Sequence, residues 1–215
     1  MAITSYATLK TTVADYLHRS DLSDSVMSVF VQLGEARLNR KLRLLQQEAT
    51  STLSLTAGSE SVSLPTGWLE TIDVIYSDDK RPIHPQNIKS LNSQRTYDST
   101  TSRPYLYATT DGTMIFEITA DATYSIDINY FKSWDIETDD TNWLLVNAPD
   151  AYLYSALLEA KAYTKSQQDV SLWSGGLETA MGDLNRLDNR TRRNATVRMD
   201  SALSRSGRFD INRGY

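Results

Sequence analysis

The chain has 215 residues, of which 40% are hydrophobic and none is cysteine, and it carries a formal net charge of −5 at pH 7. This hydrophobic content supports one large domain, or one domain with an insertion, around a substantial core. The absence of cysteine excludes disulfides, thiolate nucleophiles and cysteine metal sites, and no apolar run is long enough to span a membrane, so we expect no membrane partner.

The charge is distributed unevenly along the chain. Residues 188–215 contain seven Arg, no Lys and three Asp, a balance of +4, whereas residues 1–187 carry a balance of −9. An acidic body with a basic tail counts against a general DNA-binding domain. It favours a tail that contacts an acidic partner.

Two helices are predicted at the start of the chain. Ser5 can cap a short helix that ends near His18, and a longer helix is expected from Asp24 to Gln47. The apolar residues of the longer helix form two adjacent stripes, Val26, Val29, Phe30, Leu33, Ala36 and Leu44 on one and Met27, Val31, Leu38, Leu42 and Leu45 on the other. Its polar side is then limited to Ser28, Gln32, Glu35, Asn39 and Arg43. A helix that is apolar over so much of its girth needs neighbours on two sides, and some of them can come from another subunit.

After Gln47 the apolar pattern changes from a helical period to a period of two, which predicts short antiparallel strands. The dipeptide Asp111-Gly112 predicts a tight hairpin, because both turn positions tolerate a positive φ. The run TYSIDINYF, residues 123–131, predicts a strand with Tyr124, Ile126, Ile128 and Tyr130 on one face. A short helix can also form between His84 and Tyr97.

Helices return in the last third of the chain. The segment 135–147 is expected to be a loop, and Pro149 opens a third helix as a first-turn residue. A fourth helix is expected from about Gln168. The predicted buried residues of these helices are Leu153, Leu157, Ala160 and Tyr163 in the third, and Trp173, Leu177, Ala180 or Met181, Leu184 and Leu187 in the fourth.

The pattern as a whole predicts an α+β fold. The N-terminal and C-terminal helices form one helical bundle, which is interrupted by an antiparallel β-rich insertion and followed by an extended C-terminal arm. The expected divisions are residues 1–48 and 136–187 for the bundle, 49–135 for the insertion and 188–215 for the arm. The arm has few apolar residues and no sustained period, so by itself it should be disordered and fold on a partner; the alternative is a solvated terminus without a role.

Catalytic chemistry has little support in the sequence. His18 and His84 are the only histidines, and neither belongs to a recognisable catalytic motif. The carboxylates of Asp78-Asp79 and of Glu137, Asp139 and Asp140 are typical of turns and solvated loops. We therefore expect no catalytic, metal or cofactor site, and a small hydrolase that uses these carboxylates remains a remote alternative.

Several motifs carry a resemblance to a known family. The segment GEARLNRKLR, residues 34–43, lies in the long helix, and Pro104-Tyr105, the Asp111-Gly112 hairpin and Tyr130-Phe131 follow in order. This series resembles the head-to-tail adaptor (connector) proteins of tailed bacteriophages. One departure is Ile118-Thr119, where the family pattern leads us to expect a proline.

The resemblance implies a structural role in the neck of a virion that is assembled in the host cytoplasm. Such adaptors form a ring, commonly of twelve subunits, beneath the portal protein, and they extend the DNA channel towards a downstream tail or nozzle protein. DNA passes through without specific binding. The residues expected to bind the portal through the arm are Arg190, Arg192, Arg193, Arg198, Arg205, Arg208, Phe209, Ile211, Arg213 and Tyr215. Those expected at the ring interface are Leu38, Leu42, Arg37 and Arg40.

A second alternative is a DNA-packaging accessory protein that grips nucleic acid through the Arg-rich tail. Such binding would fall steeply with salt. The three Asp among seven Arg, and the absence of Lys, count against it.

Overall fold

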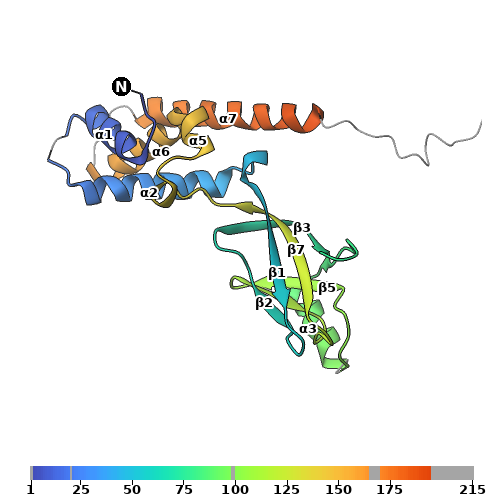
Figure 1. Ribbon diagram of the computed structural model, residues 1–215. Helices are drawn as coiled ribbons and strands as arrows, with labels where there is room; N and C mark the ends of the chain where they lie inside the picture. Colours follow the sequence, from blue (N-terminus) through green and yellow to red (C-terminus); the bar gives the residue numbers. More distant parts are fainter. Residues whose placement is uncertain (1, 20, 98–99, 165–169, 195–215) are drawn as a thin grey trace, which may run out of the picture.

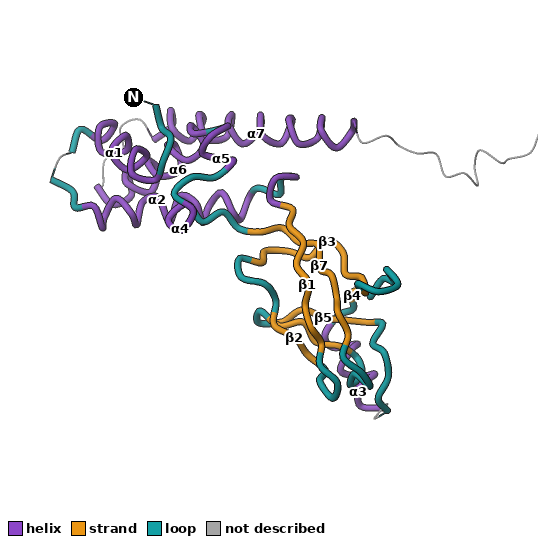
Figure 2. The backbone as a smooth tube through the Cα atoms, in the orientation of Figure 1, coloured by secondary structure: helices purple, strands orange, loops and turns teal. Residues whose placement is uncertain are grey.

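The computed structural model describes residues 2–19, 21–97, 100–164 and 170–194. A layer of helices forms one part of the molecule, and a strand-rich part projects from it (Figures 1 and 2). Each part has its own hydrophobic core: one uses residues from Leu9 to Leu44 and from Ile136 to Leu184, and the other uses residues from Leu53 to Tyr130. The predicted α+β fold is confirmed.

The helical layer contains residues from both ends of the chain. Its helices are α1 (Tyr6–Leu17), α2 (Asp24–Lys41), α4 (Ile136–Asp139), α5 (Trp143–Asn147), α6 (Pro149–Thr164) and α7 (Val170–Asn194). Ser5 caps α1, because its side chain accepts a hydrogen bond from the backbone N–H of Thr8. Helix α6 lies against α1, α2 and α7, and therefore joins the N-terminal and C-terminal helices.

Helix α2 ends earlier than the sequence predicted. It stops at Lys41, Leu42 has an extended backbone, and a 3₁₀ turn, η1 (Leu45–Gln47), leads into the first strand. Leu42 and Leu44 are both buried in the helical core. Alternate residues of an extended segment share a face, whereas a continued helix would point these two leucines about 200° apart. Burial of both side chains therefore favours the early end of α2.

The strand-rich part consists of two sheets that share one core. The first sheet has the order β1-β7-β3 and the second has the order β2-β6-β5-β4, with β4 parallel to β5. The strands are β1 (Glu48–Leu55), β2 (Ser61–Ser63), β3 (Trp68–Tyr76), β4 (His84–Pro85), β5 (Leu106–Thr110), β6 (Thr113–Phe116) and β7 (Tyr124–Lys132), and α3 (Ile88–Tyr97) packs beside β5.

Two local predictions for this part are confirmed. Asp111 and Gly112 have φ values of 45° and 69° and connect β5 to β6, as a tight hairpin turn requires. Ile126, Ile128 and Tyr130 of β7 are buried, and the residues between them are more exposed.

The segment 135–147 was predicted to be a loop, and this prediction is wrong. Asp135 and Asn142 accept hydrogen bonds from the backbone N–H groups of Thr138 and Leu145, and so cap the short helices α4 and α5. These helices bury Ile136, Leu144 and Leu145 in the helical core. The burial predicted for Tyr163 and Leu187 is also wrong, since their side chains are 60% and 46% exposed.

Gly34 lies at a close approach of α2 and α6. A Cβ atom at this position would lie 2.8 Å from the backbone N of Ala156 and 2.8 Å from Oγ of Ser155. The nearest backbone atom cannot move away without a shift of α6. The glycine of the GEARLNRKLR segment therefore permits the contact that joins the N-terminal helices to the C-terminal ones.

We predict that Gly34→Ala destabilises the folded protein by roughly 1–3 kcal/mol, because the added methyl group overpacks the contact. Gly182→Ala in α7 is the matched control. No neighbouring atom lies within 4 Å of a Cβ at that position, so the change should stabilise α7 by up to about 1 kcal/mol. Chemical unfolding of both variants measures the difference. Equal effects of the two substitutions would show that the helices do not need this glycine.

Candidate functional site

The leucines predicted for the ring interface lie inside the chain's own core. Leu38 and Leu42 are both 0% exposed and belong to the helical core. The prediction that these two side chains are open to a neighbouring subunit is wrong, because both are buried in the helical layer, where α2 packs against α6. Arg37 pairs with Glu159 of α6, while Arg40 is exposed. A ring contact through either arginine stays a prediction.

The uncovered apolar surface of α2 lies on the other stripe. Val29 and Leu33 are each 47% exposed, one helical turn apart, whereas Met27, Phe30, Val31 and Leu38 of the same helix are buried. Arg40 is exposed on the same side, seven residues after Leu33. We name Val29, Leu33 and Arg40 the outer face of α2. In the described chain, this is the apolar face of α2 that stays exposed to solvent.

The predicted arm begins later than residue 188. Helix α7 continues through Asn194, and Asp188 is buried where it accepts hydrogen bonds from the backbone N–H of Leu45 at 2.7 Å and from Nε of Arg192 at 2.6 Å. Arg192 also pairs with Glu48 of β1 at 2.7 Å. These contacts fasten the last turns of α7 to the point where the chain leaves the helical layer for the sheets.

This arrangement divides the predicted portal-binding residues into two groups. Arg192 is used within the chain, and Arg190 is exposed on α7. The others lie outside the described residues or, for Arg193, have a side chain outside them: Arg193, Arg198, Arg205, Arg208, Phe209, Ile211, Arg213 and Tyr215. Their role in binding stays a prediction.

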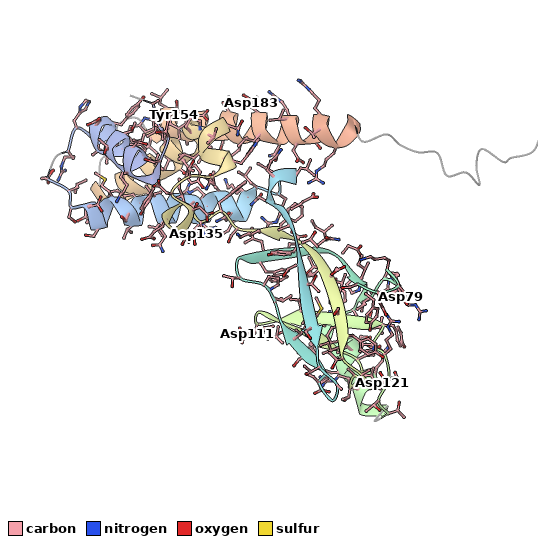
Figure 3. The ribbon with its side chains drawn as sticks, in the orientation of Figure 1. Asp79, Asp111, Asp121, Asp135, Tyr154 and Asp183 are labelled. Carbon is pink, nitrogen blue, oxygen red and sulfur yellow. The ribbon has the colours of Figure 1, made fainter. Side chains whose placement is uncertain are left out.

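The junction between the helices and the sheets is held by two residues of α2. The Asn39 side chain accepts a hydrogen bond from the backbone N–H of Trp134 at 2.9 Å and donates one to its carbonyl oxygen at 3.0 Å. One turn earlier, the Glu35 carboxylate accepts hydrogen bonds from the backbone N–H of Ile136 at 3.0 Å and from the Tyr152 hydroxyl at 2.7 Å. The segment that returns from β7 is thus fixed along α2, near Asp135 in Figure 3.

Sequence reasoning placed Glu35 on the polar side of the helix, whereas its side chain is only 7% exposed. The detectable signal was the spacing of Glu35 and Asn39, which are four residues apart on one helical face. That spacing indicates a shared neighbour but does not identify it, because Trp134 and Ile136 are about one hundred residues away in the chain.

Burial raises the pKa of Glu35 above its usual value of 4.5, and its hydrogen bonds offset this only in part. Because the pKa is raised in the folded state, the stabilisation from protonated Glu35 is complete below the unfolded pKa and is lost as the pH rises through the folded pKa. We therefore predict that wild type loses stability relative to Glu35→Gln as the pH rises from about 4.5 to neutrality. Urea unfolding of both proteins across this range measures it, and a pH-independent difference would contradict it.

The carboxylates considered for catalysis have structural partners. Arg103 pairs with Asp78 at 2.7 Å and with Asp79 at 2.9 Å, and its guanidinium lies 3.7 Å from the centre of the Tyr76 ring. Hydrogen bonds from Ser77, Thr52 and Lys80 lower the pKa of Asp127 to about 2. These contacts brace the turn after β3 against β7. Among the residues that the structure describes, no group of three or more His, Asp or Glu side chains is placed to hold a metal ion.

The other acidic residues considered for catalysis lie at the surface, in a short helix and the turn that follows it. Glu137, Asp139 and Asp140 are exposed in and after α4, at the surface of the helical layer. The carbonyl oxygen of Asp140 accepts a hydrogen bond from the backbone N–H of Tyr6.

No described helix is long and apolar enough to cross a membrane.

Comparison with known proteins identifies the family of this chain. Residues 4–200 match the family model described as SU10 adaptor protein, which covers both cores and the whole of α7. The chain therefore belongs to the SU10 adaptor protein family, a family of bacteriophage head-to-tail adaptors. No curated protein matches the sequence.

Proposed function

We propose that the chain is the structural head-to-tail adaptor of a tailed phage and forms a homo-oligomeric ring of twelve copies in the neck of the virion. The ring binds the portal protein through the C-terminal arm and extends the DNA channel towards the tail. Family membership supports the adaptor role. The observation that carries the ring is the outer face of α2, where the apolar residues Val29 and Leu33 are each 47% exposed.

Contact between copies through this face would bury apolar surface that a single chain leaves in water. Full burial of one Val or Leu side chain contributes about 1.5–3 kcal/mol relative to exposure. In a closed ring of identical subunits, every contact between neighbours uses the same surfaces. The free energy gained by burying this patch is therefore repeated at each contact. Arg40 lies at the end of the same face and can pair with a carboxylate of a neighbour, in line with the acidic body of the chain.

The double variant Val29→Asp, Leu33→Asp tests this contact. We expect it to keep the native circular dichroism spectrum and to fail to assemble on purified portal, because two charges would have to be desolvated at every contact. Ile72→Asp on β3 is the matched control, since Ile72 is 46% exposed and lies outside the helical layer. The control should assemble normally. Normal assembly of the double variant would exclude the outer face of α2 as the ring contact.

The arm is proposed as the portal-binding element. Helix α7 has 25 residues, which corresponds to a length of about 38 Å, and it projects past the other helices in Figure 1. The anchoring of Asp188 and Arg192 fixes the direction in which its last turns leave the body. An arm that carries four Arg beyond Asn194, with Phe209, Ile211 and Tyr215 towards its end, suits a partner surface that is acidic and contains apolar pockets.

The β-rich part is proposed to face the next tail component. It extends away from the helical layer and from α7 (Figure 1). Within it, Arg103 ties the segment before β5 to the turn after β3 through Asp78 and Asp79. The surface that we propose to face the tail is therefore held together by these ion pairs.

The DNA-packaging alternative predicts that duplex DNA binding falls steeply as salt rises. We expect only weak, non-specific DNA binding, since the body is acidic. The hydrolase alternative predicts an activity that is lost in Asp139→Asn, Asp140→Asn with assembly unchanged. No observation on the described residues favours either alternative.

A further inference from the structure

A cleft of about 350 Å³ opens between the outer edge of β3 and the strands β4 and β5 of the second sheet. The chain that returns from the turn after β3 pairs with it only as far as Ile83, which donates a backbone hydrogen bond to Val74. Hydrogen-bonded pairs of an antiparallel ladder recur at every second residue, so the next pair would join Ile72 to Pro85. Pro85 has no backbone N–H and lies opposite Tyr107 of β5 instead, so β3 and β4 separate at this point.

The first part of β3, residues 68–73, is therefore an open sheet edge. It has no neighbouring strand on its outer side among the described residues. An open edge presents unpaired backbone donors and acceptors, which are a template for a further strand. The register of β3 against β7 shifts twice within this part, and such bulges bend the edge and discourage pairing with arbitrary strands. An occupant of the cleft must therefore be short and matched to the edge.

One polar group inside the cleft lacks a partner. Tyr107 is only 5% exposed and lines the cleft, and its hydroxyl makes no hydrogen bond within the described part of the chain. The hydroxyl is not among the buried atoms that are closed to solvent, so an occupant can reach it. Burial and, after it, the carboxylate of Asp73 raise the pKa of Tyr107, so the hydroxyl stays neutral and can both donate and accept a hydrogen bond.

The other walls of the cleft combine apolar side chains with one free carboxylate. Leu69 and Ile72 line it from β3, and Pro82 lies in the opposite wall. Asp73 is exposed, and its Oδ1 accepts a hydrogen bond from the backbone N–H of Val74, which leaves capacity for a further donor. A sheet edge beside apolar pockets is the arrangement that takes up an extended peptide, because main-chain bonds give affinity and the pockets give specificity.

We propose that this cleft receives a short extended segment of the next tail component, which adds to the first sheet as a strand along the open edge of β3. The segment presents an apolar side chain to the wall formed by Leu69 and Ile72. It also offers a donor, from a Lys, Arg or amide side chain, to Asp73 and the Tyr107 hydroxyl. The cleft lies in the β-rich part, between β3 and β4 in Figure 2.

A second copy of the chain is not expected to supply this strand. Pairing of β3 with β3 of another copy uses the same edge twice, which gives a closed dimer with two-fold symmetry and no ring. Every strand of the described chain already pairs within its own sheet, and the arm is proposed for the portal. A strand from another protein remains. The inference therefore rests on the proposed function, in which the β-rich part faces the tail.

Hydrogen exchange measured by mass spectrometry tests for the added strand. The complex of the full chain with purified portal is compared with and without the purified tail protein that joins the neck of the same phage. At saturating tail protein, the outward amides of residues 68–74 should exchange about tenfold more slowly or slower still, because a new strand protects them. The control is β1, the opposite edge of the same sheet, whose exchange should not change.

Two variants test the side chains of the cleft. Tyr107→Phe removes one hydroxyl and keeps the ring, and it should weaken binding of the tail protein roughly threefold to tenfold through the lost hydrogen bond. Tyr105→Phe is the matched control, since Tyr105 is 59% exposed and lies outside the cleft. Ile72→Asp places a charge in the apolar wall and should weaken the same binding by more than about tenfold. All three variants should bind portal as wild type does.

Equal affinities of the Tyr107→Phe and Tyr105→Phe variants for the tail protein would overturn the proposal, as would unchanged exchange of β3. Slower exchange of β3 on portal binding, before tail protein is added, would show that a neighbouring copy fills the cleft and would also overturn it. A wild-type complex that binds no tail protein removes the proposed orientation of the β-rich part together with this inference. A complex that binds tail protein with β3 unprotected removes the inference alone.

Discussion

A chain that ends at Asn194 is expected to keep its fold and to lose attachment to portal-bearing heads. Both hydrophobic cores of the described chain are built from residues that this truncation retains, the last of them Leu184. Each exposed Arg–carboxylate pair contributes only about 0.2–1 kcal/mol, so a single arm binds weakly. Arms presented together by a ring dock at high effective concentration, which raises the overall affinity by roughly 10²–10⁴. The truncated chain should lose this gain.

The measurement is a pull-down with purified portal, with circular dichroism to verify the fold. Phe209→Ala with Tyr215→Ala should be nearly as damaging as the loss of Arg205, Arg208 and Arg213 together, because apolar anchors supply the energy that exposed ion pairs lack. A truncated chain that attaches with full affinity would identify the arm as a solvated terminus, and the portal contact would then lie on the body.

The second large effect is expected within the helical core. Leu38→Asp should destabilise the chain by more than about 4 kcal/mol, because it places a carboxylate without a partner at a site that is 0% exposed. Leu33→Asp on the same helix is the control, since Leu33 is 47% exposed and a surface change typically alters stability by less than about 0.5 kcal/mol.

Thermal unfolding of the isolated chains compares the two variants. The sequence alone assigned Leu38 to contact between subunits, and the structure assigns it to folding. If the Leu38→Asp protein had native stability, Leu38 could not be a core residue. The assignment of the Leu38 stripe of α2 to the helical core would then be contradicted.

The sequence predicted what local patterns decide. Alternation along β7 and the two turn residues Asp111 and Gly112 determine the strand and the hairpin without help from distant contacts. Pro149 marks the start of α6 for the same reason. These features depend on neighbouring residues, which a single sequence displays directly.

Features that depend on distant contacts were not predictable. The two stripes of α2 were visible, but which of them α6 would cover depended on the close approach at Gly34. The continuation of α7 beyond residue 187 depends on Asp188, whose partners include Leu45. The sequence around Asp188 is polar and Arg-rich, so it indicated an arm where the structure has two further helical turns.

The mass and symmetry of the complex with portal protein test the central claim most directly. Purified chain and purified portal ring are mixed, and the complex is examined by native mass spectrometry and electron cryomicroscopy. The account predicts one closed ring of identical copies seated on the portal, with the outer face of α2 between neighbours and the arms against the portal. A chain that remains monomeric in the presence of portal, or that binds it without forming a closed ring, would contradict the account.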